Sequence, residues 1–188
     1  MLRRTTLVLV LFVVFGTPAA AAVPRLTPAP PLPLPLLPGA TQAHAVLSGS
    51  VVAELNRVRA TRGLRPLRST VALSASARRH SAQMGRRGYF DHDSADGTPF
   101  WRRIERFYAG RGFRSWEVGE NIFWQSPTTI AAISVVRSWL ASPGHRANAL
   151  GRRWRDVGVG AVSLPSAPGV YGGSPVTIVT MDFGIRKR

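Results

Sequence analysis

The chain has 188 residues, no cysteine and a formal net charge of +16 at pH 7. This length suits one domain with extensions, and the lack of cysteine excludes disulfide bonds, a thiol nucleophile and a lipid-modified cysteine anchor. The basic residues are nearly all arginines, scattered without a dense basic run or a nucleic-acid-binding motif. We therefore expect no nucleic-acid partner. The positive charge either favours binding to anionic surfaces or is a compositional bias, with arginine replacing lysine across a solvated surface.

The first 22 residues have the pattern of a secretory signal peptide. Arg3 and Arg4 precede a short apolar stretch, and a run of alanines at 20–22 offers a cleavage site. The apolar stretch is shorter than the roughly 20 residues that span a bilayer, and a retained anchor is the alternative. Residues 23–46 are proline-rich and predict an extended linker. We expect a secreted, extracellular protein whose folded domain covers residues 47–186.

Hydrophobic periodicity predicts helices first and strands last. The expected helices are one capped by Ser48 or Ser50 and ending before Gly63, then 69–85, 99–108 and 128–141, with a short helical turn after residue 145. Two stretches rich in β-branched residues, 157–162 and 176–181, predict a pair of strands. Helices followed by a hairpin indicate an α+β domain.

Three short segments carry the side chains best suited to a functional site. They are Tyr89–His92, Gly119–Ile122 and Ser142–Asn148. Among their side chains are two imidazoles and the Glu120 carboxylate, which suit either a shallow metal site or a general acid/base site. Only a tertiary fold brings segments so far apart in the chain together.

With their neighbours, these segments resemble the CAP superfamily (SCP-like, or cysteine-rich secretory, antigen 5 and pathogenesis-related-1), in its bacterial secreted branch. The resemblance extends from about residue 47 to residue 184, over the segments Leu55–Leu67, Ala77–Met84, Tyr89–Gly97, Val118–Ile122, Ser138–Leu150, Asp156–Gly160 and Met181–Gly184. It implies an α-β-α sandwich with a small antiparallel sheet flanked by helices, here without disulfides.

The resemblance also implies a cavity lined by two histidines and two acidic residues. His92 matches the first histidine, Glu120 the acid of the Gly-Glu-Asn motif and His145 the second histidine. Ser142 stands where the second acid is expected, which removes a carboxylate and lowers the expected affinity for a divalent cation. His92, Glu120, Ser142 and His145 are thus the predicted cavity and ligand-binding residues.

These residues have several alternative roles. His92 and His145 are the candidate ligands for zinc or another weakly bound divalent cation, or they form hydrogen bonds only. Glu120, which we place in a turn, either holds an imidazole or acts as a catalytic base beside the two histidines.

We expect structural roles for the polar residues outside this set. We expect His80 on a helix surface and His44 in solvent before the domain. The side chains of Asn121 and Asn148 are expected to satisfy backbone groups around the cavity.

The sequence favours a non-enzymatic extracellular binding protein for a small apolar or lipid ligand, or for an anionic cell-wall polymer. The chain has no Gly-x-Ser-x-Gly, His-Glu-x-x-His or phosphate-binding glycine motif. The alternatives are a metal-assisted extracellular hydrolase and a structural envelope interaction module with the proline-rich segment as spacer. The protein is either released or stays on the cell wall through its charge.

Overall fold

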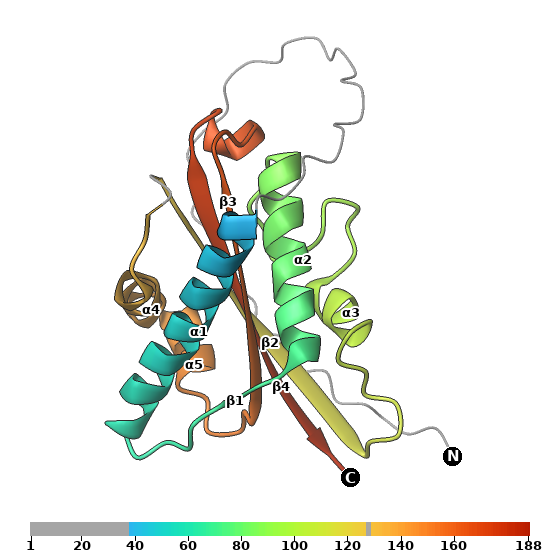
Figure 1. Cartoon of the computed structure of the whole chain (residues 1–188). Coiled ribbons are helices and arrows are strands. Elements are labelled where there is room, and N and C mark those ends of the chain that lie inside the picture. Colours follow the sequence, from blue (N-terminus) through green and yellow to red (C-terminus); the bar gives the residue numbers. More distant parts are fainter. Residues whose placement is uncertain (1–37, 127–128) are drawn as a thin grey trace.

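The structure, a computed structural model, describes residues 38–126 and 129–188; the predicted signal peptide and residues 23–37 of the predicted linker lie outside them. A four-stranded sheet lies between two helical layers (Figure 1). The layers comprise α1 (Pro38–Ala60), α4 (Ala132–Ala141) and α5 (Pro143–Ala149) on one side, and α2 (Val71–Arg87) and α3 (Phe100–Glu105) on the other. The α-β-α sandwich is confirmed.

The sheet has the strand order β1-β3-β4-β2. Its strands are β1 (Arg68–Ser69), β2 (Ser115–Gln125), β3 (Asp156–Leu164) and β4 (Val176–Lys187), with a 3₁₀ helix, η1 (Gly169–Tyr171), between the last two. The three long strands are antiparallel, as predicted, while the two-residue β1 pairs with β3 in parallel. Strand β2 is the long element that the sequence analysis did not predict, and it forms one edge of the sheet.

Helix α1 begins at Pro38, ten residues before the predicted cap at Ser48 and inside the stretch assigned to the linker. Proline fits the first turn of a helix, where its missing N–H has no partner to lose, and no later proline interrupts α1. The early turns place His44 against β3, where its Nε2 accepts a hydrogen bond from the backbone N–H of Ser163 at 2.9 Å. The prediction of a solvated His44 was therefore wrong.

Helix α2 matches its prediction within two residues at each end. Thr70 caps it by accepting a hydrogen bond from the backbone N–H of Leu73 at 3.3 Å, and Gly88 ends it in the left-handed conformation. The chain then turns back along the sheet toward His92. The end of α2 thus determines where the first predicted segment lies.

The two faces of β3 differ in side-chain size. Val157, Val159 and Ala161 are buried toward α1 and α4, whereas Gly158 and Gly160 face α2. A Cβ on Gly160 would lie 2.0 Å from the backbone nitrogen of Arg78, which is far inside van der Waals contact. These glycines let α2 pack directly on the strand backbone, which explains the alternating Val-Gly pattern.

Candidate functional site

Glu120 lies in the middle of β2 and not in the turn that the sequence analysis expected. It pairs across the sheet with Asp182 of β4, and it is 3% exposed. Glycine and asparagine on either side of it favour a turn by local propensity. The ladder to β4 overrides that propensity and directs the carboxylate toward α2 and α3.

Glu120 holds His92 and is itself held by Arg103. The Nδ1 atom of His92 lies 2.9 Å from Oε1 of Glu120, and the Arg103 guanidinium forms a short ion pair with Oε2. Arg103 also donates a hydrogen bond to the carbonyl oxygen of His92 at 2.9 Å. One guanidinium thus fixes both the carboxylate and the loop that carries the histidine.

The sequence analysis missed Arg103, although a signal for it exists. The apolar stripe of the third predicted helix consists of Phe100, Ile104 and Phe107, and position 103 falls on the same stripe. An arginine on a core-facing stripe indicates a buried acidic partner. In the structure Arg103 is buried.

His145, in α5, lies near His92, with their ring centroids 6.1 Å apart. The predicted role of the two asparagines is confirmed, because both side chains anchor α5 to β2. Asn121 donates to the carbonyl oxygen of His145, and Asn148 donates to that of Glu120, each at 3.0 Å. The structure therefore brings His92, Glu120 and His145 together.

Ser142 stands at the junction between α4 and α5, three residues before His145. It occupies the N-cap position of α5, but its side chain makes no capping hydrogen bond. It supplies no charge to the cluster, in keeping with the loss of an acidic residue at this position.

His80 is buried beside the same cluster, so its predicted place on a helix surface was wrong. Its Nε2 lies 2.9 Å from the carbonyl oxygen of Asp91 and 3.9 Å from Oε1 of Glu120. Burial is the main reason that the pKa of His80 falls to about 4. His80 is therefore neutral at pH 7.

The ionisable groups of the cluster have pKa values shifted in different directions. Burial alone would raise the pKa of Glu120, but Arg103, His80 and His92 together lower it to about 2. For His92, burial lowers the pKa, but the hydrogen bond to Glu120 outweighs it and the net pKa is raised. Burial, with the neighbouring His92, lowers the pKa of His145 to about 4. At neutral pH the cluster thus holds an ionised carboxylate and a neutral His145.

The donor set does not match a zinc centre with three protein ligands. Both oxygens of Glu120 already contact Arg103 or His92, which leaves the imidazoles of His92 and His145. Within the described ranges, no three His, Cys, Asp or Glu residues are grouped to hold a metal ion. The histidine pair alone fits only an ion whose remaining ligands come from solvent or from a bound molecule.

An apolar groove lies between α1 and the residues leading into α4, and neither His92 nor His145 lines it. It has a volume of about 620 Å³ and is lined by Gln42, Ala43, Val46, Leu47, Ser50, Ile130, Ala131 and Ala132. None of the four predicted cavity residues lines it. Val46, on its rim, is 63% exposed.

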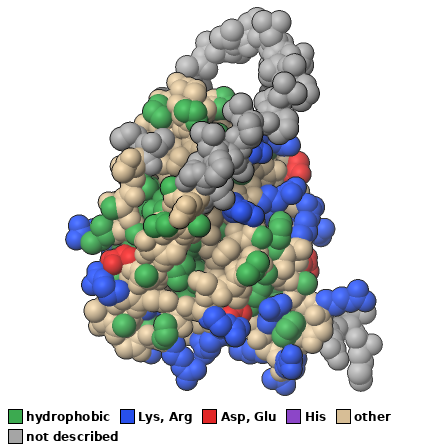
Figure 2. Space-filling view, in the orientation of Figure 1, with side chains coloured by type: hydrophobic (Ala, Val, Ile, Leu, Met, Phe, Trp, Pro, Cys, Tyr) green, Lys and Arg blue, Asp and Glu red, His purple; other side chains and the backbone are tan. Residues whose placement is uncertain are grey.

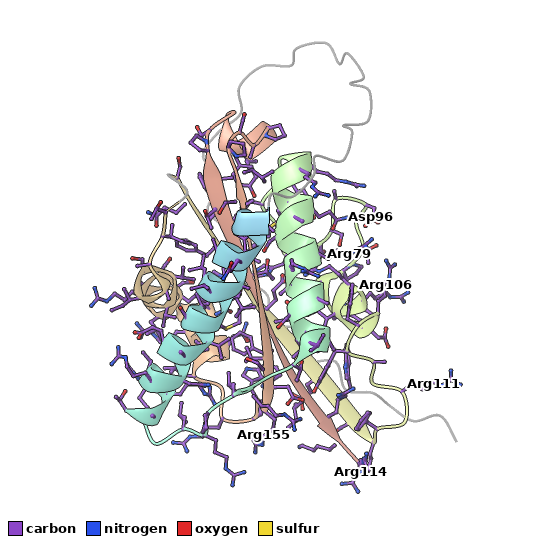
Figure 3. All side chains as sticks on the ribbon, in the orientation of Figure 1. Arg79, Asp96, Arg106, Arg111, Arg114 and Arg155 are labelled. Atoms are coloured by element: carbon purple, nitrogen blue, oxygen red, sulfur yellow. The ribbon has the colours of Figure 1, made fainter. Side chains whose placement is uncertain are left out.

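On the face in view in Figure 2, the described arginines do not form one basic patch. Figure 2 shows basic side chains at several separate places on the face in view. In Figure 3, the labelled arginines lie on α2 (Arg79), between α3 and β2 (Arg106, Arg111 and Arg114) and just before β3 (Arg155), and all five are exposed. Across the described part of the chain, no helix combines the length and apolarity needed to cross a membrane.

Comparison with known proteins gives a match to the model of the cysteine-rich secretory protein family, CAP, over residues 52–183. The uncharacterized protein YkwD of Bacillus subtilis (strain 168) is 38% identical over 117 residues, which cover 62% of this chain and 42% of that protein. This chain therefore spans less than half the length of that relative.

Solved structures share the fold. An extracellular protein containing an SCP domain from Bacillus anthracis str. Ames has a TM-score of 0.61 and 26% identity, covering 83% of this chain and 45% of that chain. An outer surface protein from Borrelia burgdorferi has a TM-score of 0.56 and 20% identity, covering 73% and 90% respectively. These two similar proteins are described as extracellular or outer-surface.

Proposed function

The chain belongs to the cysteine-rich secretory protein (CAP) family, and from that premise we propose that it is an extracellular binding protein for an apolar ligand. The observation that carries the proposal is the open groove of about 620 Å³ between α1 and α4. Its volume is within the ~300–1,000 Å³ typical of small-molecule sites. Alkyl side chains on its wall, such as Val46 and Leu47, suit an acyl chain or another lipid.

The histidine pair lies apart from the groove and offers a second, polar site. His145 is neutral at pH 7 and His92 is held by Glu120, so the two rings offer hydrogen bonds to a polar ligand group. A divalent cation such as zinc would bind there weakly, through His92 and His145.

The geometry of Glu120 disfavours the hydrolase alternative. A general base needs a carboxylate that can reach a water molecule or a substrate proton. Glu120 is buried, and its oxygens contact Arg103 and His92, so it is suited to holding an imidazole.

The location that we propose is the cell exterior, reached through the predicted signal peptide over residues 1–22. The similar solved structures described as extracellular or outer-surface support this location. The distributed arginines would favour weak, salt-sensitive contact with anionic wall polymers or lipid headgroups.

The test of apolar binding uses Nile red, an uncharged fluorescent dye, with long-chain fatty acids as competitors. We expect Val46→Glu in the groove to weaken dye binding at least tenfold, because the substitution places a charge on the apolar wall. Val170→Glu, at a position that is 60% exposed on η1, is the matched control and should bind as the parent does. Equal binding by both variants, or no dye binding by the parent protein, would reject the groove and favour a structural envelope module.

A further inference from the structure

We propose that the buried carboxyls of Asp182 and Glu120 share one proton, which Asp182 carries and donates to Glu120 in a hydrogen bond. Asp182 is then a positioning residue for the carboxylate that holds His92. The inference concerns the histidine pair invoked in the proposed function, but its test needs no ligand. Either proposal can therefore fail without the other.

The first argument is the position of the two carboxyls in the sheet. Glu120 of β2 and Asp182 of β4 are directly opposite each other in the antiparallel register. Glu120 is 3% exposed and Asp182 is fully buried. Side chains at such positions have Cβ atoms about 4.5–5.5 Å apart, and two like charges there repel each other.

The second argument is the charge balance around the pair. The neighbouring groups come from the elements packed on it: Ser76 and His80 from α2, Arg103 from α3 and His92 from the loop between them. Arg103 is the buried guanidinium that pairs with Glu120. His80 is neutral at pH 7. Arg103 and His92 both contact Glu120, whereas no cationic side chain of the described residues forms an ion pair with Asp182, so an ionised Asp182 would be a buried charge without a partner.

The third argument identifies which carboxyl carries the proton. In the described structure, neither oxygen of Asp182 has a hydrogen-bond partner at normal distance, although the nearby Ser76 hydroxyl acts to lower its pKa; Glu120, in contrast, contacts both Arg103 and His92. An ionised carboxylate requires donors, but a protonated one can itself donate to the acceptor beside it, which is Glu120. Burial and the charge of Glu120 raise the pKa of Asp182 well above its usual range, in agreement with this assignment.

The consequence for the site is a fixed orientation of His92. Glu120 remains ionised and accepts hydrogen bonds from Asp182, Arg103 and Nδ1–H of His92. In its neutral form His92 keeps its proton on Nδ1, and Nε2 is then the acceptor nitrogen. Asp182 keeps its proton, and its positioning role requires no proton transfer.

The direct test is the ¹³C carboxyl NMR signal of Asp182 in the full-length protein. We expect the chemical shift of a protonated acid at pH 7, unchanged from pH 5 to pH 8. A shift typical of a carboxylate at pH 7 would overturn the proposal, whatever the variants do.

Two variants and a control test the positioning role. Asp182→Asn keeps a donor toward Glu120, so the pKa of His92, followed by ring-proton NMR, should move by less than about 0.3 units. Asp182→Leu removes the donor and should move that pKa by more and change the ¹⁵N signature of its tautomer. Thr180→Val, another buried substitution on β4, should lower the melting temperature but leave His92 unchanged. Equal His92 shifts in the Asn and Leu variants would refute the hydrogen bond.

Discussion

The two faces of the sheet stabilise the protein in different ways. Toward α1 and α4, the strands bury apolar side chains such as Val159, Met181 and Phe183. Toward α2 and α3, the same sheet buries Asp182 and Glu120, and Arg103 packs over the latter. The first face depends on area removed from water, whereas the second combines apolar contacts, such as those of Met84 and Ile178, with a matched charge pair. Only the second face positions His92.

The sheet face toward α2 and α3, which we call the charged face, carries the Arg103–Glu120 ion pair. The largest expected effect comes from removing the Arg103 guanidinium. Arg103→Leu leaves Glu120 buried without its guanidinium partner, and we expect a loss of about 3–5 kcal/mol in unfolding free energy at pH 7. In the parent protein the pKa of Glu120 is lowered to about 2, so its stabilisation is present above pH 4.5 and lost as the pH falls toward 2. The variant gains a protonated Glu120 at low pH, so the difference should shrink there.

Urea denaturation at pH 7 and pH 4 measures this difference. Met181→Ala is the control on the apolar face, with an expected loss of about 2–5 kcal/mol at either pH. If Arg103→Leu lost the same unfolding free energy at pH 7 and pH 4, as Met181→Ala should, the charge pair on the second face would be contradicted.

The next effect concerns the close approach of α2 to the sheet. Gly160→Ala places a Cβ where the backbone of α2 already lies, 2.0 Å from the nitrogen of Arg78. Backbone atoms cannot move aside as a flexible side chain can, so we expect a loss of about 3 kcal/mol, measured by thermal and urea denaturation. A nearly unchanged melting temperature would mean that α2 is not in contact with β3 at this point.

His80 should make the charged face sensitive to mild acid. Its pKa in the folded protein is about 4, below the ordinary 6.5, so its contribution is complete above pH 6.5 and is lost as the pH falls toward 4. Between pH 7 and pH 5 we expect a loss of about 2 kcal/mol in unfolding free energy. His80→Gln, which cannot take up a proton, should flatten this dependence, whereas His145→Gln, at a partly exposed site, should do so less. An unchanged pH profile in His80→Gln would assign the acid sensitivity to another group.

The smallest effect has the opposite sign. Gly49 lies in α1, and no atom lies within 4 Å of the position that a Cβ would occupy there, so Gly49→Ala meets no obstacle. We expect a gain of about 0.5–1 kcal/mol, because alanine loses less backbone entropy in a helix. Gly49→Ala and Gly160→Ala are the same chemical change, and denaturation should show changes in unfolding free energy of opposite sign. A loss at Gly49 would show that α1 does not continue through this position.

Local patterns predicted most of the helices and two of the strands, but they failed at β2. The residues around Glu120 favour a turn locally, and their strand conformation depends on pairing with β4, some 60 residues later. The surface position expected for His80 was wrong, although its neighbours Arg78 and Arg79 are exposed. His80 falls on the inward stripe of Leu73, Ala77 and Met84, so helical spacing does indicate its burial, and the loop returning from α2 contacts it through the carbonyl oxygen of Asp91.

The sequence by itself determined the family, the α+β class and the identity of His92, Glu120 and His145, because these depend on residue types in a fixed order. The tertiary structure alone decided that Glu120 is a buried strand residue and that Arg103 neutralises it. It also placed Asp182 opposite Glu120. Charge balance in an interior depends on distances between elements, and these distances arise only when α2 and α3 pack on the sheet.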